Sequence, residues 1–160
     1  MSTSSFRLDL AREDDLSALL QLVRAFHDFE QVEMTDGERR AVLEPLLRPG
    51  NPDGRIWMVR AGPTASGYLA LTFGYSIEFR GRDAFVDEFF LDESLRGRGI
   101  GSEVLDRVKA EAAVLGVHAL HLEVARDNES ARRLYERWGF RARERFHLMS
   151  CHLVPAAVDR

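Results

Sequence analysis

The sequence predicts an α/β protein in which helices flank a mixed, mostly antiparallel sheet. Two observations support this class. Apolar segments of strand length alternate with longer segments in which apolar residues recur every three or four positions. In the C-terminal half, a strand, a helix and a second strand follow directly, an order that makes the two strands parallel. With 160 residues, 45% of them apolar, the chain suits a single domain over 1–160.

Hydrophobic periodicity and turn residues divide the chain into elements. The acidic run Glu13–Asp15 suits a helix N-terminus, and Gly116 suits the end of a later helix. The Pro- and Gly-rich segment 49–54 is a loop rather than a domain boundary. The expected elements are, in order, a strand over 6–10, a helix over 13–29, a helix around 42–47, strands over 56–61, 67–75 and 85–91, a helix over 100–115, a strand over 118–124, a helix over 129–138 and a closing apolar strand.

The most informative segment is the turn 96–102, Arg-Gly-Arg-Gly-Ile-Gly-Ser, which joins a strand to a helix. Its glycines let the main chain approach a ligand and take backbone angles that a Cβ forbids. The helix behind it presents unpaired N–H groups and a positive dipole end, which bind phosphate. Arg96 and Arg98 add positive charge, and Ser102 can donate its hydroxyl. A tight turn with solvated arginines is the plainer alternative.

Two other phosphate-binding patterns compete with this interpretation. A P-loop ends in Gly-Lys-Ser/Thr, and the single lysine, Lys109, lies well inside the helix, which argues against a nucleoside triphosphatase. A dinucleotide fold needs its third glycine one position later, where the chain has Ser102. Glu123 nevertheless lies about 20 residues further on, as a ribose-binding acid would. The dinucleotide fold is therefore the nearest rival.

A second motif begins one helix and one strand after the turn. The two motifs together contain Arg96, Gly99, Gly101, Asn128, Ala131, Tyr135, Gly139 and Phe140. In order and spacing they resemble the acetyl-CoA signature of the GNAT family of N-acetyltransferases. Within the family, residues 85–91 and 97–102, together with the hairpin before them, most resemble spermidine/spermine acetyltransferases and their thialysine-acetylating relatives. The resemblance implies the GNAT fold, in which the parallel strands splay apart and the pantetheine arm of acetyl-CoA inserts between them.

The resemblance also assigns the residues that bind the acyl donor. It implies that backbone groups of Phe89, Phe90 and Leu91 pair with the pantetheine arm. Asn128 would bond the pantetheine or the substrate, although capping of the following helix is a sufficient reason for an Asn there. Ser102 is, alternatively, a first-turn helix residue with no ligand. The expected pyrophosphate-binding residues of the turn are Arg96, Gly97, Arg98, Gly99, Ile100, Gly101 and Ser102.

Acyl transfer from a thioester to an amine needs a neutral amine and a protonated leaving thiolate. Asp87 and Glu88, on the strand beside the thioester, are the candidate proton acceptors. Strict alternation sends their side chains to opposite faces, but family members carry a bulge on this strand, and relatives place Glu before Asp. The choice between the two therefore stays open. Pairing with arginines or amides in the sheet is the alternative for either residue.

Tyr135 is, by resemblance, the acid that protonates the departing CoA thiolate. On periodicity alone it would be a packing residue, because Leu134 and Trp138 occupy the buried stripe of the same helix. The motif, and not the pattern of hydrophobic residues, favours the catalytic interpretation.

Three residues are candidates for binding the acceptor amine: His27, Glu30 and Glu78. The first two belong to the segment 27–33, where relatives among the polyamine acetyltransferases line the amine-binding mouth, and its acidic residues suit a cation. Glu78 lies in a hairpin that forms a second candidate wall. A solvated acidic loop and ordinary packing of His27 are the plainer alternatives.

Composition argues against several other partners and sites. A net charge of −4 disfavours nonspecific nucleic-acid binding, and no apolar run approaches the ~18 residues of a membrane span. The start of the chain lacks the pattern of a secretory signal, so we expect a cytoplasmic protein. His118 and His121 face opposite sides of a strand, so we expect no metal. Cys151 is expected to pack in the closing strand, and the resemblance implies a homodimer.

The predicted function is direct transfer of acetyl from acetyl-CoA to a primary amine, without a covalent enzyme intermediate. A small cationic amine, such as a polyamine or a thialysine-like amino acid, is the expected acceptor. The alternatives are a protein N-terminal or lysine acetyltransferase, which needs an open groove, and an acyl-CoA-binding sensor without turnover.

Overall fold

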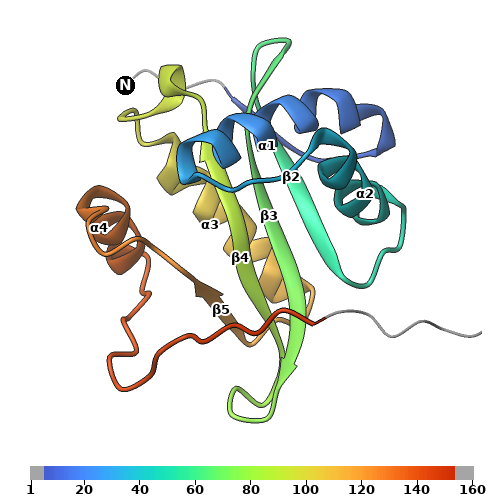
Figure 1. The fold of residues 1–160 in the computed structure, drawn as a ribbon. Coiled ribbons are helices and arrows are strands. Elements are labelled where there is room, and N and C mark those ends of the chain that lie inside the picture. Colours follow the sequence, from blue (N-terminus) through green and yellow to red (C-terminus); the bar gives the residue numbers. More distant parts are fainter. Residues whose placement is uncertain (1–5, 154–160) are drawn as a thin grey trace, which may run out of the picture.

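A sheet in the order β1-β2-β3-β4-β5 forms the centre of the computed structural model, which describes residues 6–153 (Figure 1). Neighbouring strands are antiparallel except β4 and β5, which are parallel, as the strand–helix–strand order predicts. Short 3₁₀ turns at Glu13–Asp15 and Glu93–Leu95 precede α1 and α3. The elements are β1 (Arg7–Leu10), α1 (Leu16–Glu30), α2 (Asp36–Leu47), β2 (Gly54–Ala61), β3 (Thr64–Ser76), β4 (Gly81–Leu91), α3 (Ile100–Val114), β5 (Ala119–Leu122) and α4 (Glu129–Arg137).

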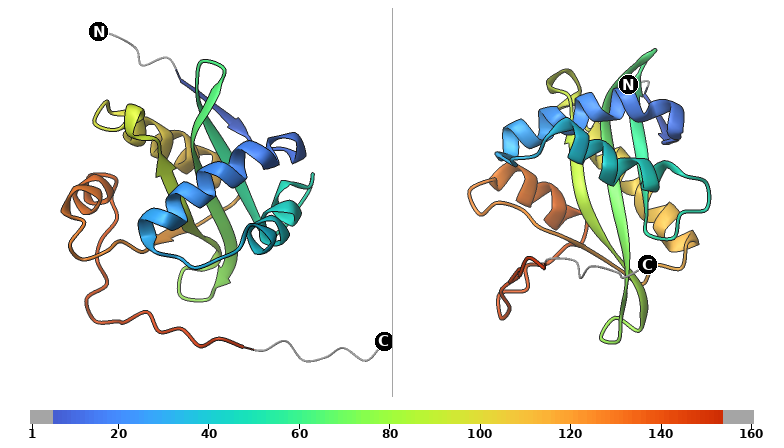
Figure 2. Two further views of the ribbon diagram at one scale, coloured as in Figure 1. Left: turned by 45° about the horizontal axis from the view of Figure 1, so that its top comes forward. Right: turned by 45° about the vertical axis from the view of Figure 1, so that its right-hand side comes forward.

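Helices cover both faces of the sheet: α1 and α2 lie on one face and α3 on the other (Figures 1 and 2). The central strand β3 contributes to both layers by alternation. Tyr68 and Ala70 pack with α1 and α2, whereas Leu69 and Leu71 pack with α3. Because β3 is buried on both sides, it provides a rigid support for the strand β4 beside it.

Strand β4 contains a bulge, at the position where the family resemblance implies one. Ala70 of β3 lies opposite Glu88, and Leu71 lies opposite Val86, so Asp87 is an extra residue in β4. The bulge changes the alternation of the strand: Val86 packs on the α3 face, and Glu88 contacts residues of the α1 face. Both carboxylate residues therefore sit at one irregularity in the sheet.

The two parallel strands separate directly after this bulge. Their register pairs Asp83 with Ala119 and ends where Val86 meets Leu122. Strand β4 continues to Leu91, so over the described residues its last part has no strand beside it on the β5 side. The helix α4 lies beyond that open edge (Figure 1). The expected GNAT arrangement, a mixed sheet with a splayed parallel pair and flanking helices, is confirmed.

The expected closing strand is wrong. Residues 139–153 form neither a helix nor a strand, and the apolar side chains Phe146, Leu148 and Met149 are exposed. A strand needs a neighbour for its backbone hydrogen bonds. In the described part of this segment the backbone instead makes a local turn, in which the Phe146 amide donates to the Arg143 carbonyl. Cys151 is likewise exposed and does not pack as expected.

Gly67 provides a test of how closely β3 and β4 approach each other. A Cβ on Gly67 would lie 2.6 Å from the Phe90 carbonyl oxygen and 2.8 Å from Leu91 Cδ2, so the strands would have to separate. We predict that Gly67→Ala lowers the free energy of unfolding by about 1–3 kcal/mol in urea denaturation. The control Gly37→Ala in α2, whose nearest contact is at 4.0 Å, should be neutral or stabilising. Equal stability of Gly67→Ala and the native chain would contradict this packing.

Candidate active site

Glu88 is held by hydrogen bonds to both of its carboxylate oxygens. His27 Nε2 lies 2.7 Å from Oε1, and the Tyr68 hydroxyl donates to Oε2 at 2.6 Å. Tyr68 is fully buried, and His27 is only 4% exposed. Burial, followed by the charge and hydrogen bond of Glu88, raises the pKa of Tyr68, so the phenol keeps its proton and acts as a donor. The Glu88 side chain is therefore fixed in one orientation.

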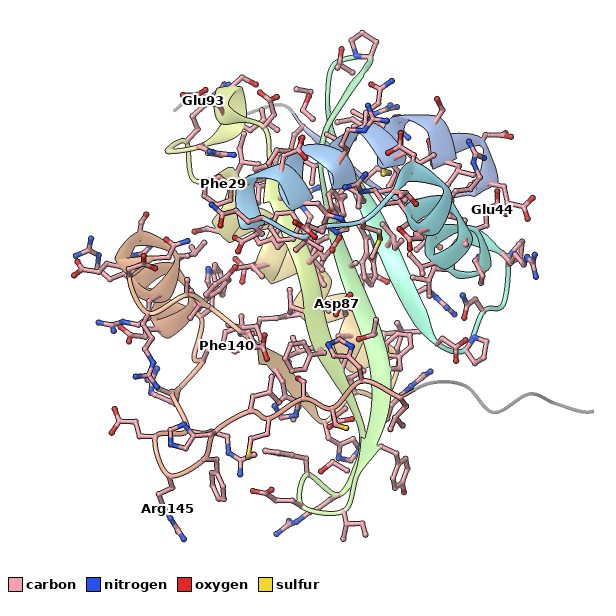
Figure 3. All side chains as sticks on the ribbon, viewed as in Figure 1. Phe29, Glu44, Asp87, Glu93, Phe140 and Arg145 are labelled. Carbon is pink, nitrogen blue, oxygen red and sulfur yellow. The ribbon has the colours of Figure 1, made fainter. Side chains whose placement is uncertain are left out.

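Asp87, the bulge residue, has an exposed side chain at the centre of the view in Figure 3. Loss of part of its hydration, followed by the negative charges of Glu88 and Glu123, raises the pKa of Asp87. Glu123 directly follows the short strand β5. Asp87 is thus the more accessible of the two carboxylates that the bulge brings together.

Tyr135 in α4 is a packing residue, as the periodicity of the helix predicts, and it carries a protonated phenol. Its ring packs against the core on the α3 side and meets the Phe140 ring edge-on, with 5.8 Å between the ring centroids. Burial, followed by the negative charge of Glu30, raises the pKa of the Tyr135 phenol. The phenol is therefore protonated at neutral pH, and Glu30 at the end of α1 lies close enough to influence it.

The glycine-rich turn has the backbone conformation that its sequence requires. Gly97 and Gly99 have φ angles of 67° and 77°, in the left-handed region, and a Cβ on either would meet no atom within 4 Å. Gly99 is the N-cap residue of α3 and has no side chain to satisfy the first N–H groups. Those groups, including that of Ser102, remain available for an anion.

Both arginines of the turn donate hydrogen bonds to backbone carbonyl groups. Arg96 Nε donates to the Leu91 carbonyl at 2.8 Å, and Arg98 donates to the Ser94 carbonyl at 3.3 Å. Ile100 is buried and anchors the start of α3. The positive charges therefore stand beside the turn and the end of β4.

Close packing brings the two motifs together. A Cβ on Gly101 would touch Leu91, Phe89 and Leu134 at 3.5–3.8 Å, so α3, α4 and β4 meet at this glycine. Phe89 and Leu91 pack on the α3 side and Phe90 on the α1 side, which leaves their backbone along the open edge of β4. This is the edge at which the resemblance expects a pantetheine arm.

Asn128 caps α4, as the capping alternative predicts. Its Oδ1 accepts a hydrogen bond from the Ala131 amide at 3.1 Å. The cap uses the oxygen of the side-chain amide and leaves the NH₂ group as the donor for a ligand.

The three candidate amine-binding residues lie in different surroundings. His27 is buried between Glu88 and Arg39, and it lines an open cavity of about 400 Å³ together with Asp28 and Glu33. Glu30 is exposed near Tyr135. Glu78 pairs with Arg143 at 2.7 Å and lines a cavity of about 1070 Å³ along β5, which Glu123 and Tyr135 also line. The structure brings His27 into contact with Glu88, and it places Glu30 near Tyr135, which lines the same cavity as Glu78.

Sequence reasoning missed Tyr68 and Arg39. Tyr68 is one of several apolar residues in a strand, and nothing in the pattern distinguishes it. Arg39 did carry a signal, because it takes the first position of a buried stripe that continues with Leu43 and Leu47. An arginine in such a stripe needs a buried partner.

Possible metal sites and membrane-spanning helices can be searched for in the described residues. Within 6–153, no group of three or more His, Cys, Asp and Glu side chains could hold a metal ion. His121 Nε2 lies 3.3 Å from the Asp83 carboxylate, and His118 packs beside Gly81. In the same part of the chain, no helix is long and apolar enough to cross a membrane.

Comparisons with known proteins agree with this architecture. Residues 18–140 match the acetyltransferase (GNAT) family. Thialysine N-epsilon-acetyltransferase from Bos taurus is 30% identical over 145 residues, which cover 81% of this chain and 80% of the relative. An integron cassette protein from the mobile metagenome of Cole Harbour Salt Marsh has a TM-score of 0.79 at 32% identity, covering 92% and 91% of the two chains. An aminoglycoside N-acetyltransferase in complex with CoA has a TM-score of 0.78 at 16% identity, covering 94% and 97%.

The chain therefore belongs to the GNAT family and is an N-acetyltransferase, an enzyme class that takes its acetyl group from acetyl-CoA. The family assignment replaces the dinucleotide-binding alternative. Glu123, the residue that supported that alternative, lies near Asp87 and contributes to its electrostatic environment.

The raised pKa of Asp87 predicts a stability effect with a definite sign. A carboxyl whose pKa is raised by folding stabilises the fold below the unfolded value of 3.8, and this contribution is lost as pH rises through the folded pKa. Asp87→Asn should therefore have a higher Tm than the native chain at pH 7, and the difference should vanish below pH 3.8.

Asp92→Asn is the matched control, because the hydrogen bond from the Ser94 amide lowers the pKa of Asp92. It should bring no stabilisation at pH 7. A lower Tm of Asp87→Asn at pH 7 would contradict the proposed crowding of negative charge around Asp87.

Proposed function

We propose that this enzyme transfers acetyl from acetyl-CoA to the primary amine of a small cation, such as a polyamine or a thialysine-like amino acid. The observation that carries the proposal is the group of carboxylates at the separation of β4 and β5. The negative charges of Glu88 and Glu123 act on Asp87 there, and the charge of Glu30 acts on Tyr135. Such a field attracts a cationic acceptor and disfavours an anionic one.

The donor site fits acetyl-CoA at two places. The turn with Gly97 and Gly99 and the uncapped start of α3 suit the pyrophosphate, and the open backbone edge of Phe89, Phe90 and Leu91 suits the pantetheine amide groups. Bound acetyl-CoA supplies the acetyl thioester. The side chains of this protein then bind, orient and exchange protons with the reacting groups.

Asp87 is the proton acceptor for the amine in this proposal. An alkylammonium group has a pKa of about 10.4, so removing its proton at pH 7 costs about 4–5 kcal/mol. Asp87 is exposed, its pKa is raised, and no protein donor occupies its oxygens among the described residues. Glu88 already accepts two hydrogen bonds and serves instead as the fixed negative charge beside Asp87.

Tyr135 is the proton donor for the leaving thiolate. Its phenol is protonated because burial and Glu30 disfavour the phenolate. In this proposal the Tyr135 side chain approaches the thiolate from α4, whereas Asp87 lies in β4, across the open edge of that strand. One residue therefore takes the proton of the amine, and the other gives a proton to the thiolate. Direct attack of the amine on the thioester needs no enzyme nucleophile.

Assembly as a homodimer remains a prediction from the resemblance, and a cytoplasmic location remains a prediction from the sequence.

The acceptor class is tested by the release of CoA thiol from acetyl-CoA. We expect release with spermidine, spermine or thialysine, and a kcat/KM that falls with added salt because long-range attraction is screened. Release only with N-terminal or lysine peptides would favour the protein acetyltransferase and contradict the small-amine proposal. Thermal stabilisation by acetyl-CoA without release to any amine would favour the sensor.

The role of Tyr135 is tested by removing only its hydroxyl. Tyr135→Phe keeps the ring that packs against Phe140, so fold and acetyl-CoA binding should be preserved. We predict that kcat falls on the order of 10²-fold, with little change in the KM for acetyl-CoA. Steady-state kinetics and a thermal melt measure both quantities. An unchanged kcat would contradict the role of Tyr135 as proton donor and leave it a packing residue.

A further inference from the structure

A chain of polar side chains runs from Glu88 through α1 to α2. His27 Nε2 faces Glu88 Oε1 at 2.7 Å, and Arg39 Nε donates to His27 Nδ1 at 3.1 Å. Arg39 also donates to Asp36 Oδ1 at 2.9 Å, and Asp36 accepts from Arg24 of α1 at 3.1 Å. The chain thus connects the bulge in the sheet with the first turn of α2.

The hydrogen bond from Arg39 decides where the His27 proton lies. A guanidinium group has only donors, so the Nδ1 atom that faces it must present a lone pair. The ring proton is then on Nε2 and is donated to Glu88. A second proton on Nδ1 would point at the Arg39 N–H and would break this hydrogen bond.

Arg39 is buried, which is unusual for an arginine. It is 5% exposed, in the buried stripe of α2, and a buried guanidinium is costly unless its donors are satisfied. The start of α2 is built to hold it. The capping box of Thr35 and Glu38 fixes the first turn, which carries Asp36 next to Arg39. The next residue, Arg40, is exposed, and within residues 6–153 its one ion pair is with Glu44.

We propose that Arg39 is a positioning residue that fixes His27 as its Nε2–H tautomer and thereby keeps Glu88 as an oriented negative charge beside Asp87. The inference rests on the proposed function in one respect, the role of Asp87 as the proton acceptor. It assigns His27 and Arg39 to the maintenance of that acceptor, and not to direct contact with the amine.

The charged groups around His27 determine whether loss of Arg39 raises or lowers the pKa of Asp87. The charged and titratable groups on the packed elements are Arg39 and Asp36 of α2, Glu88 and Asp87 of β4, Tyr68 of β3, and Arg24, Asp28 and Glu30 of α1. Without Arg39, Nδ1 can take a second proton. A positive charge on His27 lowers the pKa of Asp87, so Asp87 becomes a weaker base.

The first measurement is nitrogen NMR of the His27 ring. In the native chain at pH 7, Nε2 should carry the proton and Nδ1 should present its lone pair to Arg39. In Arg39→Met the fixed tautomer should be lost and Nδ1 should gain a proton as pH falls. Arg39→Lys, which keeps a positive donor, should restore part of the native pattern, and Arg40→Met should leave it unchanged.

The second measurement is the pH profile of kcat with the best amine. We predict that Arg39→Met moves the acidic limb to lower pH and lowers the plateau roughly tenfold, whereas Arg40→Met leaves both unchanged. A purely structural role of Arg39 would lower stability without moving the acidic limb, and that result would overturn the proposal. So would a native His27 protonated on both nitrogens at pH 7.

The ring measurement needs no acceptor amine. If no amine is acetylated, the proposed function fails while the tautomer remains measurable; if the tautomer is unchanged in Arg39→Met, the positioning role fails while turnover remains measurable.

Discussion

Asp87 is one residue more than regular pairing with β3 allows, and the geometry of the site depends on how the sheet accommodates it. The bulge turns Glu88 toward the α1 face, where Tyr68 and His27 hold it. It also coincides with the end of pairing between β4 and β5 at Val86. One irregularity therefore gathers the negative charges and opens the backbone edge along which the acyl donor is proposed to lie.

The two carboxylates at the bulge have different surroundings, and this difference is the physical basis of the separate roles proposed for them. Glu88 is mostly buried, and each of its oxygens accepts a hydrogen bond from a buried donor. Asp87 is exposed, and partial loss of hydration, followed by nearby negative charge, disfavours its ionised form. These two effects lower the stability of the fold and raise the pKa of the residue proposed to face the substrate, and functional sites often combine lower stability with activity in this way.

The layers of this fold were predictable from the sequence because hydrophobic periodicity marks buried helix and strand faces directly. The turn 96–102 was also recognisable, since only glycine readily takes the left-handed angles found at Gly97 and Gly99. The closing strand was not, because an apolar segment forms a strand only where a partner edge meets it. Choosing between Asp87 and Glu88 required the register with β3, and the contact of His27 with Glu88 joins residues 61 positions apart.

The central claim is that the acceptor amine meets Asp87 where β4 leaves β5. A crystal structure with a bisubstrate conjugate, in which CoA is joined through an acetyl linker to a polyamine, tests it most directly. The account predicts that the pantetheine amides pair with the backbone of Phe89–Leu91, the sulfur lies beside the Tyr135 hydroxyl, and the amine nitrogen reaches Asp87 directly or through one water. An amine bound at Glu78, or a pantetheine arm away from the open edge of β4, would contradict the account.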